Sequence, residues 1–132
     1  MTKNSRQLSL KSLLALDAVT CAAMGAILLA GSAPIANLTQ IPADLLFWAG
    51  ASLIPIAAFM ALSARTTPVP GWATLLIVLG NLLWIAASLL LPAAGWIAPN
   101  PLGWAFLAGQ AGIVAVLTKL EFHALRGRAV AA

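Results

Sequence analysis

Four long apolar runs, separated by short segments rich in proline, glycine and asparagine, divide the chain. The runs cover residues 8–30, 44–63, 71–91 and 101–120, so each holds about 20 residues. A helix rises about 1.5 Å per residue and therefore crosses the roughly 30 Å hydrocarbon core of a bilayer in that length. The pattern predicts an all-α protein with one domain over residues 1–132, built as a four-helix transmembrane bundle.

The connections between the runs predict that neighbouring helices are antiparallel, because each connection is too short to cross a membrane. Residues 31–34 contain a glycine and a proline and are expected to end the first helix. Residues 65–71 join the second and third helices, and residues 92–101 join the third and fourth. Asp44 is expected in the first turn of the second helix, where the helix dipole favours negative charge.

The composition supports a membrane location. The chain is 62% hydrophobic and 8% charged, whereas about a quarter of the residues in a soluble domain are charged. The first run has a basic flank, as signal peptides have, but it is longer than the roughly 7–15 residues of a signal-peptide core. We therefore expect the first helix to be retained.

The seven lysine and arginine residues predict the orientation. They all fall on one side of the predicted membrane. Lys3, Arg6 and Lys11 lie at or before the start of the first helix, Arg65 lies between the second and third helices, and the end of the fourth helix carries Lys119, Arg126 and Arg128. Because basic residues accumulate on the cytoplasmic side of membrane proteins, both termini are expected in the cytoplasm.

Three strongly polar residues lie deep in the predicted helices, at similar depth: Asp17, Asn81 and Gln110. A lone aspartate at the centre of a membrane helix costs about 2.5–3.5 kcal/mol, and hydrogen bonding or protonation reduces that cost. We therefore expect the three side chains to meet inside the bundle. There, a protonated Asp17 could donate a hydrogen bond to the carbonyl oxygen of either amide.

Four further residues are predicted to surround this site. Thr20 and Cys21 follow Asp17 by about one turn, and Trp84 and Ser88 share a helix face with Asn81. Two interpretations of the site stay open. It responds to protons or a ligand, as ionisable residues inside membranes often do, or it only fastens helices together, at about 0.6 kcal/mol per hydrogen bond.

Several kinds of chemistry are excluded or disfavoured. A single Cys21 excludes a disulfide within the chain, and a single His123 excludes ligation of one haem by two histidines of the same chain. No grouping resembles a catalytic triad or a metal site, and no basic stripe suggests nucleic-acid binding. We predict no catalytic residue, metal or cofactor.

The polar residues after the fourth apolar run are expected to be solvated or to contact lipid headgroups at the cytoplasmic end. They are Glu121, His123, Arg126 and Arg128.

Three short motifs resemble those of a group of small, uncharacterised bacterial four-helix integral membrane proteins. They are Leu16-Asp17-Ala18, then Asn81-x2-Trp84-x3-Ser88, and Leu102-Gly103-x2-Phe106-x3-Gln110-Ala111. The resemblance implies the four-helix fold and a bacterial inner (plasma) membrane. It implies no particular function.

Three classes of function are considered. The favoured one is a non-enzymatic accessory, scaffolding or ligand-binding bundle in the lipid bilayer, as a homodimer or within a larger membrane complex. The alternative is an oligomeric, proton-coupled small-molecule transporter or channel that uses Asp17. The small multidrug transporters are similar in length and have an acidic residue in the first helix, but the charge bias of this chain opposes their antiparallel dimer. A membrane enzyme is disfavoured because no catalytic grouping is visible.

Overall fold

The computed structural model describes the backbone of residues 9–131 and the side chains of residues 9–127. It contains four α-helices, α2 (Leu10–Thr39), α3 (Ala43–Arg65), α4 (Gly71–Ala93) and α5 (Pro101–Ala131). No β-strand occurs among these residues. Each helix is long and apolar enough to cross a membrane. The prediction of an all-α protein with four apolar helices, each long enough to span a membrane, is confirmed.

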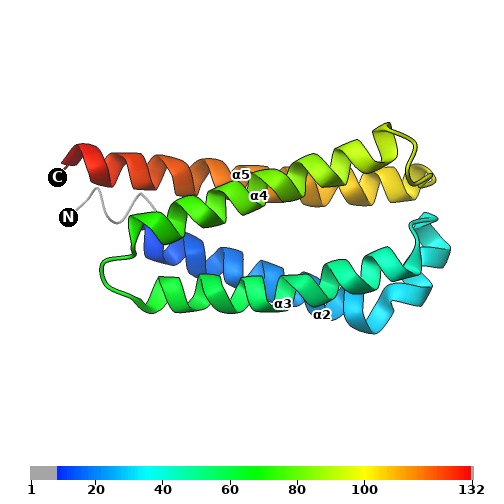
Figure 1. Ribbon diagram of the computed structural model, residues 1–132, viewed down its shortest axis with the longest axis horizontal. Helices are drawn as coiled ribbons and strands as arrows, with labels where there is room; N and C mark the ends of the chain where they lie inside the picture. The colour runs from blue at the N-terminus through cyan, green and yellow to red at the C-terminus, as the bar shows by residue number, and fades with distance from the viewer. Residues whose placement is uncertain (1–8, 132) are drawn as a thin grey trace.

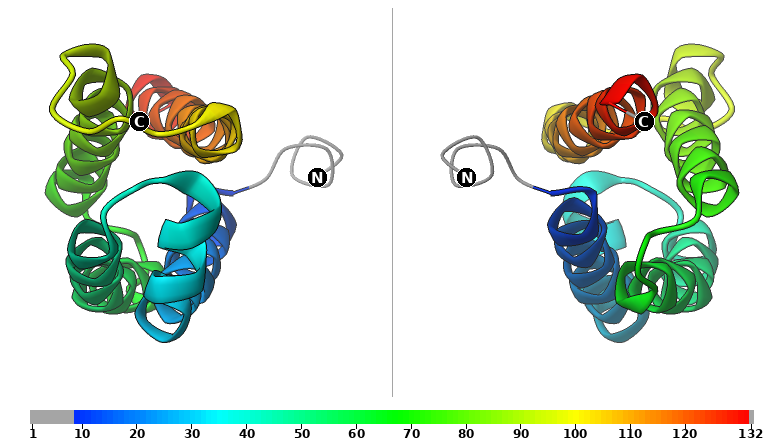
Figure 2. Two further views of the ribbon diagram at one scale, coloured as in Figure 1. Left: turned by 90° about the vertical axis from the view of Figure 1, so that its right-hand side faces the viewer. Right: turned by 90° about the vertical axis from the view of Figure 1, so that its left-hand side faces the viewer.

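The helices form two antiparallel hairpins, α2 with α3 and α4 with α5 (Figure 1). Seen along the bundle axis, the four helices stand at the corners of a square (Figure 2). α2 also packs against α5, whereas α3 and α4 scarcely touch although they are consecutive in the chain. The start of α2 and the end of α5 lie at the same end of the bundle (Figure 1). The bundle is therefore packed closely on three sides and loosely between α3 and α4.

The first helix extends beyond its predicted end. Residues 31–34 were expected to end it, but the helix only bends at Gly31, where φ is −114° and ψ is 19°, and then continues to Thr39. Pro34 falls in the first turn after this bend, where the amide hydrogen that proline lacks would have had no helical partner. The helix ends at Gln40, which adopts a left-handed conformation with φ of 60°.

The fourth helix is also longer than predicted, because it continues past residue 120 to Ala131. The residues that follow the apolar run include glutamate, leucine and arginine, which favour helix almost as strongly as alanine does. The end of the hydrophobic pattern is therefore not the end of the helix. Glu121 consequently lies within a helix that packs on the rest of the bundle, rather than in a solvated tail.

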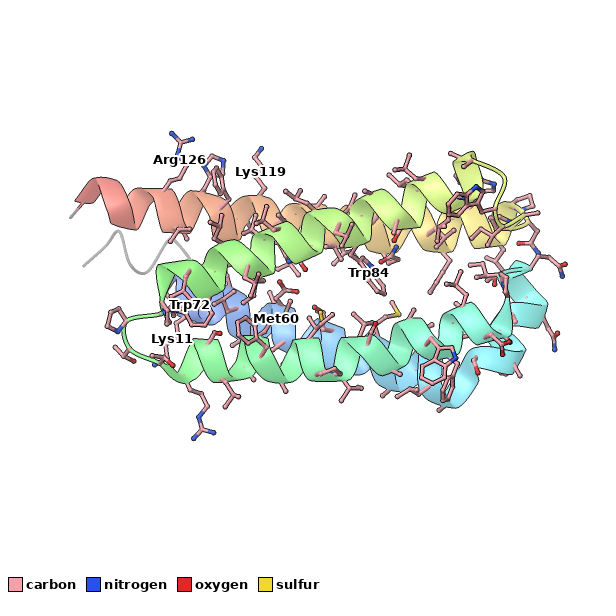
Figure 3. All side chains as sticks on the ribbon, viewed as in Figure 1. Lys11, Met60, Trp72, Trp84, Lys119 and Arg126 are labelled. Atoms are coloured by element: carbon pink, nitrogen blue, oxygen red, sulfur yellow. The ribbon has the colours of Figure 1, made fainter. Side chains whose placement is uncertain are left out.

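Basic side chains gather toward the end of the bundle where α2 begins and α5 finishes (Figure 3). Those that the structure describes are Lys11, Arg65, Lys119 and Arg126. Lys3, Arg6 and the side chain of Arg128 lie outside the described residues. The asymmetry of charge that the sequence predicts is therefore present along the bundle axis of the described chain.

α2 and α3 approach each other closely at two glycines. A Cβ atom on Gly50 would lie 2.7 Å from the Cβ of Leu28 and 2.9 Å from the carbonyl oxygen of Gly25. A Cβ atom on Gly25 would lie 3.0 Å from the carbonyl oxygen of Gly50. Small residues at such a crossing let two helix backbones approach and gain van der Waals contact, which is a main source of helix association in membranes.

We expect Gly50→Ala to destabilise the protein by about 1–3 kcal/mol, because the new methyl group would overpack this crossing. Gly109→Ala is the matched control, since a Cβ atom there would meet nothing within 4 Å, and it should be neutral or slightly stabilising. Unfolding by SDS titration in mixed micelles measures both effects. Equal stability of the two variants would contradict the close crossing.

Candidate functional site

Two clusters of polar side chains lie inside the bundle, at different heights along its axis. The carboxyl cluster comprises Asp17 of α2, Asn81 of α4 and Glu121 of α5. The amide cluster comprises Trp84 and Ser88 of α4 and Gln110 of α5. Gln110 and Glu121 are about three helical turns, or roughly 16 Å, apart along α5, whereas Asn81 and Trp84 are only about one turn, or roughly 4.5 Å, apart along α4.

The carboxyl cluster is almost completely removed from the surface. Asp17 is 1% exposed, Glu121 is 0% exposed and Asn81 is 6% exposed. The Nδ2 atom of Asn81 donates to Oδ2 of Asp17 at 3.0 Å and to Oε1 of Glu121 at 3.4 Å. One neutral amide therefore bridges two acidic side chains that come from two other helices.

Donors are unequally distributed between the two acids. The thiol of Cys21, one turn after Asp17, donates to the second oxygen of Asp17 with a distance of 3.7 Å between Sγ and Oδ1. Both oxygens of Asp17 are thus hydrogen-bonded. Oε2 of Glu121 is buried and has no hydrogen-bond partner among the described residues. Leaving such an atom unpaired in an apolar interior is costly. Glu121 is therefore the member of the cluster whose hydrogen-bonding capacity is not satisfied.

The expectation that Glu121 is solvated or lies at the headgroups is wrong, because its side chain points into the bundle. A signal in the sequence could have found it. Glu121 follows Gln110 by about three turns, and that spacing returns to the same face of an α-helix. By contrast, His123 and Arg126 are exposed, as expected.

The amide cluster is a closed network. The indole nitrogen of Trp84 donates to Oε1 of Gln110 at 2.7 Å, and Nε2 of Gln110 donates to the hydroxyl of Ser88 at 2.8 Å. Nε2 of Gln110 also donates to the carbonyl oxygen of Leu107 at 2.9 Å, and the Ser88 hydroxyl donates to the carbonyl oxygen of Trp84 at 2.7 Å. Because each of these side-chain atoms has a partner, the cluster fastens α4 to α5 and leaves no group free for other chemistry.

The predicted meeting of Asp17, Asn81 and Gln110 is therefore only partly correct. The structure brings Asp17 and Asn81 together but places Gln110 at the other level, with Trp84 and Ser88. The predicted depths of Asp17 and Gln110 are counted from opposite ends of the bundle. Because the first and fourth helices are longer than predicted, equal depths from opposite ends do not correspond to one level.

Thr20 and Cys21, which were expected to line the site, have different roles. The hydroxyl of Thr20 donates to the backbone carbonyl oxygen of Asp17 in its own helix at 2.8 Å and makes no hydrogen bond to the side chains of the carboxyl cluster. The thiol of Cys21 contacts the carboxyl group of Asp17 directly. Only Cys21 therefore extends the cluster.

A cavity of about 570 Å³ lies between α3 and α4, where these helices separate, and reaches back to α2 and α5. Its wall is formed mainly by apolar side chains, among them Met60 and Trp84, which reach into the space between the hairpins (Figure 3). The polar side chains on this wall are Thr20, Cys21, Asn81 and Gln110, together with the indole of Trp84. Asn81 thus belongs both to the cavity wall and to the carboxyl cluster, whereas Asp17 and Glu121 lie behind it.

Among the described residues, no group of three histidine, cysteine, aspartate or glutamate side chains is placed to hold a metal ion. No protein-family model, curated protein or solved structure matches this chain. The resemblance to small bacterial four-helix membrane proteins therefore rests on its three short motifs and on the four apolar helices.

The two-level arrangement predicts which side chains are energetically coupled. A double-mutant cycle of Trp84→Phe and Gln110→Leu should give a coupling free energy of about 0.6–1.7 kcal/mol, the range measured for hydrogen bonds between membrane helices. The cycle of Asp17→Asn and Gln110→Leu should give a coupling within about 0.5 kcal/mol of zero, because distant sites are additive. Unfolding free energies supply both values, and strong coupling in the second cycle would refute the separation of the clusters.

Proposed function

We propose that this protein is a small, non-enzymatic integral membrane protein that binds a neutral amphiphile in the cavity between α3 and α4. The observation that carries the proposal is the cavity itself. Its volume of about 570 Å³ falls within the roughly 300–1,000 Å³ typical of small-molecule sites, which are mostly apolar with a few polar groups that orient the ligand.

The residues on the wall favour a neutral ligand. None of the described side chains that line the cavity is charged, and the polar groups among them are amides, a hydroxyl, a thiol and an indole. A charged headgroup would be buried there without a counter-ion, which is costly. A molecule with a long apolar part and a terminal hydroxyl or carbonyl group fits better, since the amide of Asn81 lies on the cavity wall and could face its polar end.

The position of the cavity favours entry from the lipid. Ile56 of α3 and Leu76 of α4 line the cavity and are 39% and 54% exposed. Gly80 also lines it, and a Cβ atom there would meet nothing within 4 Å. Since these residues would face acyl chains in a bilayer, the ligand is expected to pass sideways between α3 and α4.

The proposed location is the inner (plasma) membrane of a bacterium, with both termini in the cytoplasm. The support for this orientation is the gathering of basic residues at one end of the bundle, together with the tendency of such residues to remain in the cytoplasm. The bilayer is the first partner, and a homodimer or a larger membrane complex is compatible with the exposed apolar faces of the helices.

A proton-coupled transporter or channel, formed as an oligomer around Asp17, is the second candidate. The position of the carboxyl cluster directly behind the cavity wall favours it, because ionisable residues inside membranes are often functional. Proton flux in liposomes that is lost in Asp17→Asn would favour transport over binding alone.

Ligand binding can be tested through Trp84. Trp48, Trp72, Trp96 and Trp104 are all exposed, so phenylalanine at these positions leaves Trp84 as the single fluorophore. A brominated monoacylglycerol added to vesicles should quench Trp84 saturably, and the unbrominated form should compete.

Gly80→Leu should weaken the apparent affinity for this probe at least about tenfold, or about 1.4 kcal/mol, because the leucine side chain would fill the cavity. Gly112→Leu is the control, since a Cβ atom there also meets nothing within 4 Å and the residue lies outside the cavity wall. Quenching that rises in proportion to the probe in both variants, without saturation, would mean that Trp84 senses only bulk lipid.

The orientation can be tested with cysteine labelling, because Cys21 is the only cysteine in the chain. In a Cys21→Ala background, Thr66→Cys in the connection between α3 and α4 should react with a membrane-impermeant maleimide only after spheroplasts are opened. Ala98→Cys, in the connection between α4 and α5, should react in intact spheroplasts. The reverse pattern would show that the orientation is inverted.

A further inference from the structure

The unequal supply of donors in the carboxyl cluster distinguishes its two acids. Asp17 accepts hydrogen bonds on both oxygens, from Asn81 and from Cys21. Glu121 accepts one hydrogen bond, from Asn81, at the longer distance of 3.4 Å, and its other oxygen is buried without a partner. Donors stabilise a carboxylate, so the surroundings of Glu121, which supply a single donor, suit its ionised form poorly.

Among the side chains that the structure describes, none with a positive charge compensates Glu121. α4 contains no charged or titratable residue, and Asn81, its contribution to the cluster, is neutral. α2 contributes Asp17 and Cys21, which add no positive charge, while its Lys11 is exposed and donates a hydrogen bond to the hydroxyl of Thr67. α3 carries its only charged residues, Asp44 and Arg65, in its first and last turns, and both are exposed.

The neighbours of Glu121 on its own helix do not neutralise it either. Lys119 and His123, two residues to either side, are exposed, as expected because positions two apart in a helix do not face each other. Arg126 is also exposed and lies over the ring of Phe122, 5.7 Å from its centroid. Two carboxylates bridged by one neutral amide would therefore be buried with no compensating cation among the described residues.

We propose that the carboxyl cluster is a proton-binding site, in which Glu121 holds a proton at neutral pH. Release breaks the O–H bond of Glu121, leaves its electron pair on the carboxylate oxygen and transfers the proton to water. The cluster can then take up or give off one proton while Asn81 keeps its bridging position. This site does not depend on the proposed ligand, because neither Asp17 nor Glu121 lines the cavity between α3 and α4.

The chain is well suited to a direct test by infrared spectroscopy. It has three acidic residues, of which Glu121 is the only glutamate. Glutamate labelled with ¹³C in its side-chain carboxyl group therefore marks one position. Vesicles of ether-linked lipids avoid the ester carbonyl bands that overlap with those of a protonated carboxyl group.

At neutral pH we expect one protonated-carboxyl band that shifts to lower frequency with the ¹³C label and also shifts in D₂O. The band should disappear as the pH is raised, with a matching gain in the carboxylate bands. Glu121→Gln should abolish it, and Asp44→Asn should leave it unchanged, since Asp44 is exposed in the first turn of α3.

A labelled wild-type protein in which the ¹³C shift affects only carboxylate bands at neutral pH would overturn the proposal. So would a protonated band that survives Glu121→Gln, or one that appears only when sodium ions are removed, which would mark a metal-cation site instead. Because the labelled wild type answers the question without any substitution, the test holds even if Glu121→Gln fails to fold.

Discussion

The two hydrogen bonds from the Asn81 amide to Asp17 and Glu121 are the interaction on which the interior depends. A bilayer offers no water to polar groups in its core, so these groups must find partners inside the bundle. Asn81 lies on α4, and its two acceptors lie on α2 and α5. One side chain thus joins three of the four helices, and it does so at the only level where the described chain buries acidic groups.

The two polar clusters illustrate how hydrogen-bond balance separates structural from chemical roles. In the amide cluster the donors and acceptors of Trp84, Ser88 and Gln110 are matched. A change in the position of any of these side chains would break a hydrogen bond. In the carboxyl cluster the oxygens outnumber the hydrogens directed at them, and one oxygen of Glu121 is left over. A proton bound to this oxygen of Glu121 would remove the unpaired acceptor from the apolar interior. Neither the Asn81 amide nor the Cys21 thiol directs a hydrogen at it.

The amino-acid sequence predicts the four helices and the charge asymmetry well, because both follow from long runs of residues of one kind. It predicts Asp17 and Asn81 as buried partners, since each is a single polar residue in an otherwise apolar stretch. It misplaces Gln110 and Glu121 because their heights depend on where α2 and α5 end. Gly31 and Pro34 look like a helix end but produce a bend, and the apolar run of α5 stops several residues before its helix does. Helix length is set by backbone geometry and packing, which hydropathy does not record.

The opening between α3 and α4 follows from the contacts that join the other pairs of helices. Gly25 and Gly50 bring α2 and α3 into backbone contact. The amide cluster joins α4 to α5, and in the carboxyl cluster Asn81 joins α4 to both α2 and α5. Between α3 and α4 there is neither a polar bridge nor a glycine crossing among the described residues, and Gly80, which could have formed one, faces open space. In lipid there is no hydrophobic driving force between helices. Because α3 and α4 are joined by neither kind of contact, they stay apart, and the cavity forms between them.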